Sequence, residues 1–400
     1  MSFVTRAQHL VRRVRHGRTG GLRAVRVVGP FHGPTGYDHH VREFVRELHR
    51  QGVAIELVDL PNWGPGRLPP DRLDPWFDTL DQPVGAPVDL HFCMPHQVVA
   101  RPGVATVNYT MFEATRVHPR WITENRLHDL VVVPTESSQR AWIASGMPAE
   151  RLAVSPLGVN TGMFGKQVPP LALHDTRGAP ISRYRVRFLN VSELGPRKNL
   201  PGLLRAWLVA TQPDDDAVLI VKLGSYRPGA YKAFQESLDA LQGELRTSLD
   251  GAAPVLFMTT VLADAEMPRL FAAATHYISM SFGEGWDQAM VEAAASGLRL
   301  IAPRHSAYEA YLDDAVARLI TSREAPVHRW IPAQENPLFD GASWWEPDLD
   351  EACRAIRAAI DRCDQPTASA RERVLSGMTW THATQSLIPL LERAAAGRRG

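Results

Sequence analysis

The sequence predicts an α/β protein of two domains, each built on a parallel β-sheet with helices on both faces. Three observations support this prediction. Short apolar runs typical of buried strands alternate with segments of helical periodicity along most of the 400 residues. A stretch rich in glycine and proline, residues 161–182, interrupts this alternation near the middle of the chain. The length, with a hydrophobic content of 44%, is enough for two cores.

The first domain is predicted at residues 23–165, after a basic arm of residues 1–22. It opens with a strand and a helix, whose apolar residues Val41, Phe44 and Leu48 recur at helical spacing. Six strands are expected in this domain, at 24–29, 53–58, 88–92, 104–108, 130–133 and 152–155. Three helices are expected between them, at 37–50, 119–127 and 137–144.

A linker at residues 166–182 leads to a second domain at 183–375, where the alternation of strands and helices resumes. Strands are expected at 186–191, 218–223, 255–258, 276–280 and 300–301. Helices are expected at 200–210, 230–245, 265–273 and 288–296. A last helix, from 381 to about 394, lies in a separate C-terminal segment of residues 376–400.

The composition narrows the class of protein. A net charge of +1 gives no reason to expect a nucleic-acid partner. Cys93, Cys353 and Cys363 are odd in number and lack metal-ligand spacing, so we expect a reducing compartment and no disulfide framework. No apolar run reaches the roughly 18 residues that a membrane span needs. These features predict a cytoplasmic protein.

The basic arm allows two interpretations. Seven arginines and no acidic residue precede Asp38, and four apolar residues of the arm could share one face of a short helix. Such an arm could contact anionic lipids at the inner face of the membrane. Alternatively, it is a solvated terminus whose arginines reflect the overall composition, since all but four of the basic residues are arginines.

The most informative segment is residues 279–297, where an apolar strand runs into a glycine-containing turn and then a helix starting near Asp287. The turn holds Glu284 and the helix holds Glu292, with seven residues between them. A strand–turn–helix junction directs free N–H groups and the helix dipole at one point, which suits a diphosphate. Glu292 could then accept hydrogen bonds from ribose hydroxyls, and Glu284 could face a sugar. The simpler alternative is two solvated surface glutamates.

A second junction of this kind carries two cations. Arg197 and Lys198 follow the predicted strand at 186–191, where a helix is about to begin. Since the chain has only four lysines, one within such a motif is less easily a coincidence. The pair predicts a phosphate site.

Residues 279–297 resemble the E-x7-E signature of retaining glycosyltransferases of family 4, which have GT-B architecture. Residues 285–288 depart from the usual Gly-Phe-Gly-Leu, although Asp287 could still cap the helix. The resemblance implies two Rossmann-like domains facing each other across a cleft, with the final helix crossing back to the first. It also implies metal-independent, hexosyltransferase-type transfer from a nucleoside diphosphate sugar to a hydroxyl acceptor, with no other cofactor.

The resemblance also implies roles for individual residues. Lys198 would contact the donor diphosphate, with Arg197 as a second cation, and Glu284 would be catalytic beside the sugar. The other donor-binding positions would be Gly33, Gly36, Thr260, Val261, Leu262, Gly285, Trp286, Asp287 and Glu292. Within this set, residues 260–262 would read the base through backbone groups. The glycines of residues 33–36 alone would be equally consistent with a tight turn.

Glu113 and Arg116 follow a first-domain strand and are expected on the acceptor side. A subgroup of family 4 carries a similar Phe-Glu-x-x-Arg element. Glu113 could orient or deprotonate the acceptor hydroxyl. Alternatively, a Glu113–Arg116 ion pair would only hold the loop.

The remaining candidate site residues have simpler structural interpretations, and two alternative functions stay open. His32, His39 and His40 lack ligand partners at metal spacing, and residues 214–216 are expected to form a solvated acidic turn. Lys222 could face the cleft. A sugar-nucleotide epimerase and an inactive nucleotide-sugar-binding subunit are the alternative functions. A nicotinamide dehydrogenase is not expected, because no Gly-x-Gly-x-x-Gly follows the first strand.

Overall fold

The computed structural model describes residues 21–61, 63–64, 66–224, 228–332, 334–362 and 368–398. The first domain has a six-stranded sheet of order β2-β1-β3-β4-β5-β6, in which all strands are parallel. Its strands are β1 (Ala24–Gly29), β2 (Ala54–Asp59), β3 (Val88–Phe92), β4 (Ala105–Tyr109), β5 (Leu130–Val133) and β6 (Leu152–Val154). Its α-helices are α2 (Gly36–Arg50), α3 (Pro119–Asn125) and α4 (Glu136–Ala144). All residues of the central strands β3, β4 and β5 are buried, as a parallel sheet covered on both faces requires.

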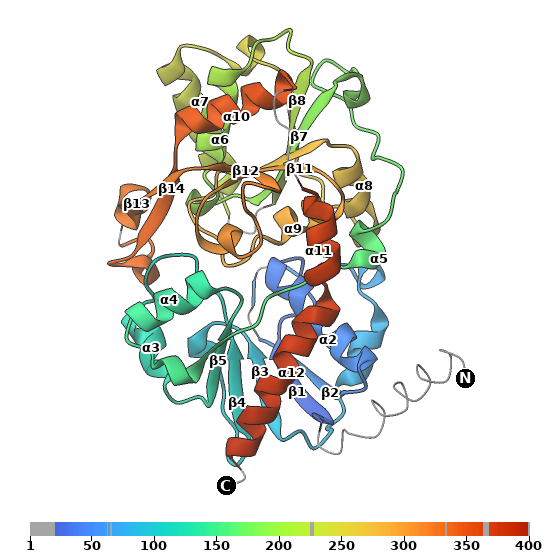
Figure 1. Cartoon of the computed structure of the whole chain (residues 1–400), viewed down its shortest axis with the longest axis vertical. Helices are drawn as coiled ribbons and strands as arrows, with labels where there is room; N and C mark the ends of the chain where they lie inside the picture. Colours follow the sequence, from blue (N-terminus) through green and yellow to red (C-terminus); the bar gives the residue numbers. More distant parts are fainter. Residues whose placement is uncertain are drawn as a thin grey trace, which may run out of the picture.

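The second domain repeats this architecture, with a parallel sheet of order β12-β11-β10-β7-β8-β9 (Figure 1). Its strands are β7 (Val186–Glu193), β8 (Ala217–Gly224), β9 (Val255–Met258), β10 (His276–Ile278), β11 (Arg299–Pro303) and β12 (Ala317–Ile320). Its α-helices are α6 (Leu200–Ala210), α7 (Ala230–Leu245), α8 (Met267–Ala272), α9 (Gln288–Ala295), α10 (Leu349–Ile360) and α11 (Ala370–Gly377).

The chain crosses between the domains twice, at neighbouring positions. The first crossing carries the short helix α5 (Thr161–Phe164), and Val159 pairs there with Thr379 of the returning chain. Gly158 is required at this crossing, because an added Cβ would lie 2.3 Å from the backbone nitrogen of Trp380. The predicted linker is docked on the second domain, since Leu171 N donates to the carbonyl of Arg269.

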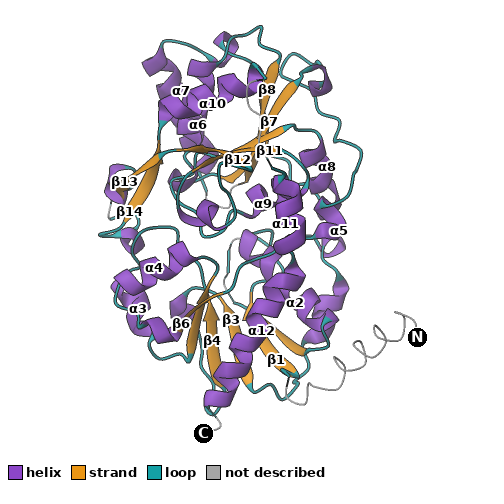
Figure 2. Ribbon diagram, in the orientation of Figure 1, coloured by secondary structure: helices purple, strands orange, loops and turns teal. Residues whose placement is uncertain are grey.

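The last helix, α12 (Trp380–Gly397), lies along the first domain (Figure 2). Its Leu387 and Leu391 are completely buried, and Glu392 accepts a hydrogen bond from the backbone N–H of Leu22, just before β1. The predicted return of the final helix to the first domain is therefore confirmed.

A hairpin that the sequence did not predict forms another contact between the domains. Strands β13 (Ser322–Pro326) and β14 (Ser343–Pro347) are antiparallel and reach the loop after β4. The rings of Phe112 and Phe339 stack there at 4.8 Å, beside the buried Trp344. Thr115 N donates to the carbonyl of Ser343, whose own N–H donates to Thr115 Oγ1. We call this contact between Phe112, Thr115, Phe339, Ser343 and Trp344 the aromatic contact.

Within the described ranges, no helix combines the length and the apolar character that crossing a membrane requires. The basic arm and the possible membrane contact predicted for it lie almost entirely outside the described residues, which begin at Gly21.

Candidate active site

The predicted Glu284 turn lies where loops of both domains meet. Strand β10 ends at Ile278, and the chain runs through residues 279–287 before α9 begins at Gln288. Gly283 packs against the loop after β4, where an added Cβ would lie 2.6 Å from the carbonyl oxygen of Glu113. Gly285 packs against Met111 in the same way, with an added Cβ at 3.0 Å from the Cβ of Met111. Both glycines therefore let the turn approach the first domain closely.

Glu284 is bound by both predicted cations. Its Oε1 lies 2.6 Å from Lys198 Nζ, and its Oε2 lies 2.8 Å from Arg197 Nη1. The residue is only 5% exposed. Burial alone would raise the pKa of Glu284, but Arg197 and Lys198 outweigh this cost and hold the pKa well below its usual value. Glu284 is thus a buried, ionised carboxylate at neutral pH.

Arg197 and Lys198 lie at the predicted junction, just before the helix begins. They belong to the 3-10 turn Pro196–Lys198, and Asn199, in a left-handed conformation, separates this turn from α6. The side chain of Asn199 accepts from Gly202 N and donates to the carbonyl of Met280, so it fixes the cation turn against the Glu284 turn. Arg197 also donates to the carbonyl of Gly283 at 2.6 Å.

Glu113 faces Arg197 from the opposite domain, with Oε1 at 3.8 Å from Nη2. Arg116 is exposed, and among the described residues no ion pair joins it to Glu113. The structure therefore does not contain the Glu113–Arg116 ion pair, which was one of the two interpretations of Glu113. Glu113 is a half-buried carboxylate beside the cation cluster of the other domain.

Glu292 differs from Glu284, although both are buried. It is 7% exposed, and its Oε1 lies 3.8 Å from Nε2 of His39 in α2. Burial raises the pKa of Glu292 to about 8, only partly offset by a hydrogen bond from Gln288. Burial lowers the pKa of His39, so this pair is uncharged at neutral pH. The protonated Glu292 can therefore both donate and accept a hydrogen bond, which suits recognition of a ribose hydroxyl.

Asp287 does not cap α9 as predicted. It occupies the N-cap position in a left-handed conformation, but its side chain makes no capping hydrogen bond. Its carboxylate instead accepts a hydrogen bond of 2.7 Å from the hydroxyl of the buried Tyr308. The prediction failed because a tertiary partner is available after β11, and residue spacing along the chain does not reveal it. Trp286 beside it is buried against Tyr311, whose hydroxyl donates to the Trp286 carbonyl, so the backbone N–H of Trp286 is the group left for a ligand.

Residues 305–308 support the Glu284 turn and were missed by the sequence reasoning. Ser306 Oγ accepts the N–H of Glu284 at 3.1 Å, and His305 Nε2 contacts the carbonyl of Ser281 at 2.9 Å. They follow β11, the neighbour of β10. A signal was available, because loops after adjacent parallel strands share one edge of the sheet.

The loop of residues 33–36 is organised by two side chains of α2. Asp38 accepts from Gly33 N at 2.6 Å and from Thr35 N at 3.2 Å, and it completes a capping box with Thr35. Arg42 donates to the carbonyl of Gly33. Gly36 is the first residue of α2, with open space where a side chain would project. The Gly33 N–H is thus already bonded within the loop.

The remaining predicted positions lie at the same edge of the second sheet. Thr260, Val261 and Leu262 follow β9, and Val261 is 57% exposed. The carbonyl of Val261 accepts from Arg72 of the first domain at 3.2 Å. Lys222 is half-buried near the end of β8, where its Nζ contacts the carbonyl of Leu223.

The acidic residues 214–216 form a largely exposed turn, as predicted, in which Asp215 and Asp216 make ion pairs. Asp215 binds Arg357 of α10 through two hydrogen bonds, at 2.7 and 3.0 Å. Among the residues that the structure describes, no group of three or more His, Cys, Asp or Glu side chains is arranged to hold a metal ion.

Comparison with solved structures shows the same fold. Anabaena Alr3699/HepE in complex with UDP superposes with a TM-score of 0.61 at 15% identity, covering 93% of this chain and 100% of that one. Sucrose-phosphate synthase from Thermosynechococcus elongatus gives a TM-score of 0.63 at 16% identity, with 94% and 100% covered. A glycosyltransferase from Rickettsia africae gives 0.61 at 11% identity, with 93% and 98% covered. The fold is GT-B. No protein-family model and no curated protein matches the chain.

Proposed function

We propose that this protein transfers a hexose from a nucleoside diphosphate sugar to a hydroxyl acceptor, with retention at the anomeric carbon. The observation that carries the proposal is the buried Glu284 paired with the partly exposed cations Arg197 and Lys198 on a GT-B fold. The cluster lies in loops at the carboxyl ends of second-domain strands, where open α/β sheets bind ligands. Retention follows from the resemblance of residues 284–292 to the E-x7-E signature.

The donor would lie on the second domain. Lys198 and Arg197 would bind the diphosphate, Glu292 the ribose, and residues 260–262 the base through backbone groups. Gly285 to Asp287 would run along the sugar. A UDP-sugar is the first donor to test, because HepE, which shares the fold, has been solved with UDP and with UDP-glucose.

The chemistry asks for stabilisation of two developing charges. The bond from the anomeric carbon to the diphosphate breaks, which leaves positive charge on the sugar and negative charge on the leaving group. Arg197 and Lys198 would stabilise the diphosphate without a divalent ion, and the ionised Glu284 would lie beside the sugar. Glu113, which faces Arg197 from the first domain, would orient or deprotonate the acceptor hydroxyl, with the exposed Arg116 on the acceptor side.

Nucleotide affinity tests this proposal. Calorimetric titration with UDP and UDP-glucose should show one site, and Lys198→Ala should weaken binding by about 1.5–3 kcal/mol through loss of a charge-assisted contact. Lys232→Ala is the matched control, because Lys232 is an 83% exposed lysine of α7. Equal affinity in the Lys198 variant and this control would refute the phosphate role. If neither UDP, GDP, ADP nor TDP binds to the wild-type protein, the proposed function fails.

The remaining expectations concern where the protein acts. We propose a cytoplasmic enzyme whose basic arm, residues 1–22, allows peripheral contact with the inner membrane face. Unchanged co-sedimentation with anionic vesicles after deletion of these residues would refute that contact.

A further inference from the structure

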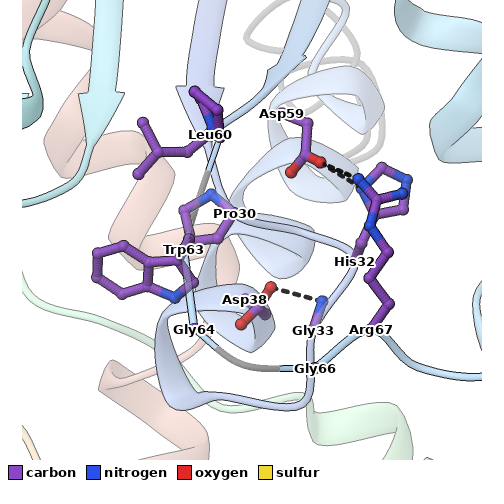
Figure 3. Close-up of a pocket in the computed structure, with 11 residues that line it drawn as sticks. Pro30, His32, Gly33, Asp38, Asp59, Leu60, Trp63, Gly64, Gly66 and Arg67 are labelled. Carbon is purple, nitrogen blue, oxygen red and sulfur yellow. Dashed lines mark hydrogen bonds and ion pairs between the residues drawn. The ribbon is translucent and has the colours of Figure 1, made fainter.

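Three histidines lie at the start of α2, and their surroundings differ. His32, just before the helix, has its Nδ1 3.0 Å from the carboxylate of Asp59 (Figure 3). His40 packs inside the first domain, with its ring centroid 5.4 Å from that of Phe92. His39 lies on another side of the helix and faces α9 of the second domain. Of the three, His39 is therefore the one placed between the two domains.

His39 and Glu292 form a pair across the domain boundary. His39 Nε2 lies 3.8 Å from Glu292 Oε1, which is longer than a hydrogen bond. This nitrogen is shielded from solvent and has no hydrogen-bond partner among the residues that the structure describes. A buried polar atom without a partner costs free energy, which a ligand that supplies the partner would recover. The structure thus holds an unused hydrogen-bonding position opposite the carboxyl group that is proposed to bind the ribose.

Both members of the pair suit a hydroxyl group. Burial lowers the pKa of His39, so its imidazole is neutral at neutral pH and keeps one donor and one acceptor nitrogen. Glu292, with a pKa of about 8, is protonated at the same pH and also offers a donor and an acceptor. Because the two atoms are 3.8 Å apart, one hydroxyl oxygen can lie about 2.8 Å from each of them. The pair carries no net charge, so it favours a neutral hydroxyl over a phosphate.

Hydrogen bonds tie both partners to the place where the chain crosses between the domains. Gln288, one turn of α9 before the glutamate, donates from Nε2 to the carbonyl of Gly158 at 3.0 Å. Asn160 donates from Nδ2 to Oε2 of Glu43, one turn of α2 after the histidine, at 3.2 Å. A rotation about the crossing displaces nearby groups less than distant ones. A small separation of the domains therefore admits a hydroxyl between the pair, and their return closes both groups on it.

We propose that His39 is a donor-binding residue, which binds a ribose hydroxyl of the donor nucleotide together with Glu292. The inference rests on the proposed function, which gives the ribose to Glu292 and no role to His39. The ribose is then held by both domains, whereas the proposed diphosphate ligands, Arg197 and Lys198, belong to the second domain alone. His39 thus makes nucleotide affinity depend on the ribose hydroxyls and on the contact between the domains.

The test compares UDP with 2′-deoxy-UDP and 3′-deoxy-UDP by calorimetric titration. Wild type should bind at least one of the deoxynucleotides about tenfold more weakly than UDP. His39→Phe, which keeps a ring but removes both nitrogens, should weaken UDP binding about fivefold, yet bind that deoxynucleotide within about twofold of wild type. His39→Leu repeats this comparison if the phenylalanine variant does not fold.

Two further variants complete the experiment. His39→Gln, whose side-chain amide can take the place of Nε2, should recover most of the UDP affinity. His49→Phe changes an exposed histidine of the same helix, and it should bind UDP and the deoxynucleotides like wild type.

Several results would overturn the inference. An equal loss of affinity for UDP and for the deoxynucleotide in His39→Phe would limit His39 to the contact between the domains. Wild-type UDP affinity in this variant would leave the ribose to Glu292 alone. Equal affinity of wild type for UDP and both deoxynucleotides would mean that no ribose hydroxyl is recognised. If another nucleoside diphosphate binds in place of UDP, its own deoxy forms are the probes, and if none binds, the proposed function fails first.

Discussion

Glu284 and Glu292, at the two ends of one segment, are buried to nearly the same extent but differ in charge. Glu284 lies between Arg197 and Lys198 and is ionised, whereas burial and nearby acidic residues raise the pKa of Glu292 to about 8 and keep it protonated at neutral pH. The difference comes from the loop after β7, which reaches one end of the segment and not the other. The motif therefore fixes the position of each carboxylate, and the surrounding loops fix its chemistry.

The largest expected effect comes from removing the charge at the ionised end. Glu284→Gln should lower turnover by about 10²–10³-fold, since a preorganised charge beside the reacting sugar is lost. UDP should bind more tightly to this variant, because Arg197 and Lys198 no longer share their charge with Glu284. Turnover assays and calorimetry would measure the two effects. Glu193→Gln, an exposed carboxylate at the end of β7, is the control. Weaker UDP binding would contradict the view that Glu284 competes with phosphate for the cations.

Glu113, a carboxylate of the first domain, extends the comparison to the other side of the site. Glu113→Gln should lower turnover about 10²-fold if Glu113 handles the acceptor proton, while UDP affinity changes less than twofold. Its 3.8 Å contact with Arg197 predicts little loss of stability, because such partly exposed pairs contribute about 0–1 kcal/mol. Wild-type turnover in this variant would leave Glu113 a purely structural partner of Arg197.

The protonated end predicts a pH dependence of stability. The pKa of Glu292 is higher in the folded state, so the folded protein retains a proton that the unfolded chain releases. This contribution to stability is full below the unfolded pKa of about 4.5 and is lost as the pH rises toward 8. The free energy of unfolding of Glu292→Gln should therefore rise relative to that of wild type by about 2 kcal/mol between pH 6 and 8. Denaturant unfolding at each pH would measure this difference. A constant difference across this range would mean that Glu292 is already ionised at pH 6.

The smallest effect is expected at the partner of Asp287. Tyr308→Phe keeps the buried ring but removes two hydrogen bonds, one to Asp287 and one with Ser279, each worth about 1 kcal/mol. We expect a few-fold loss of UDP affinity, because Asp287 leads into the helix proposed to face the diphosphate. Tyr231→Phe, on an exposed face of α7, should bind UDP like wild type. A loss of stability with unchanged UDP affinity would limit Tyr308 to packing.

Much of the fold could be predicted because buried parallel strands have a strong local signal. All six strands of the first sheet and five of the second were predicted to within a few residues. Strand β12 was missed, since it has four residues and one of them, Arg318, is exposed. Hairpin β13–β14 has no apolar alternation, because its two tryptophans are adjacent in β14 and each packs within the second domain: Trp344 on Phe282 and Phe339, and Trp345 on His305. Helix α10 did carry a readable signal, the N-cap Asp348 followed by Glu351.

For the candidate site, too, the features with a local sequence signal were predicted and the tertiary pairings were not. Sequence position alone indicated the glycines, the two cations and the two glutamates, since strand–turn–helix junctions have local signatures. It could not show that Lys198 binds Glu284, 86 positions away, or that Tyr308 takes the Asp287 carboxylate. Those pairings depend on which loops the sheet order brings together.

The aromatic contact has a consequence for the pace of catalysis. The chain crosses between the domains at Val159 and Thr379, on the opposite side of the molecule from hairpin β13–β14 (Figure 1). A rotation about the crossing that separates the domains would pull Phe112 away from Phe339 and expose both rings to water. If the nucleoside diphosphate product leaves between the domains, its release requires that they separate first. We therefore expect truncation of Phe339 to shorten the residence time of the nucleotide product without altering the groups that break the bond.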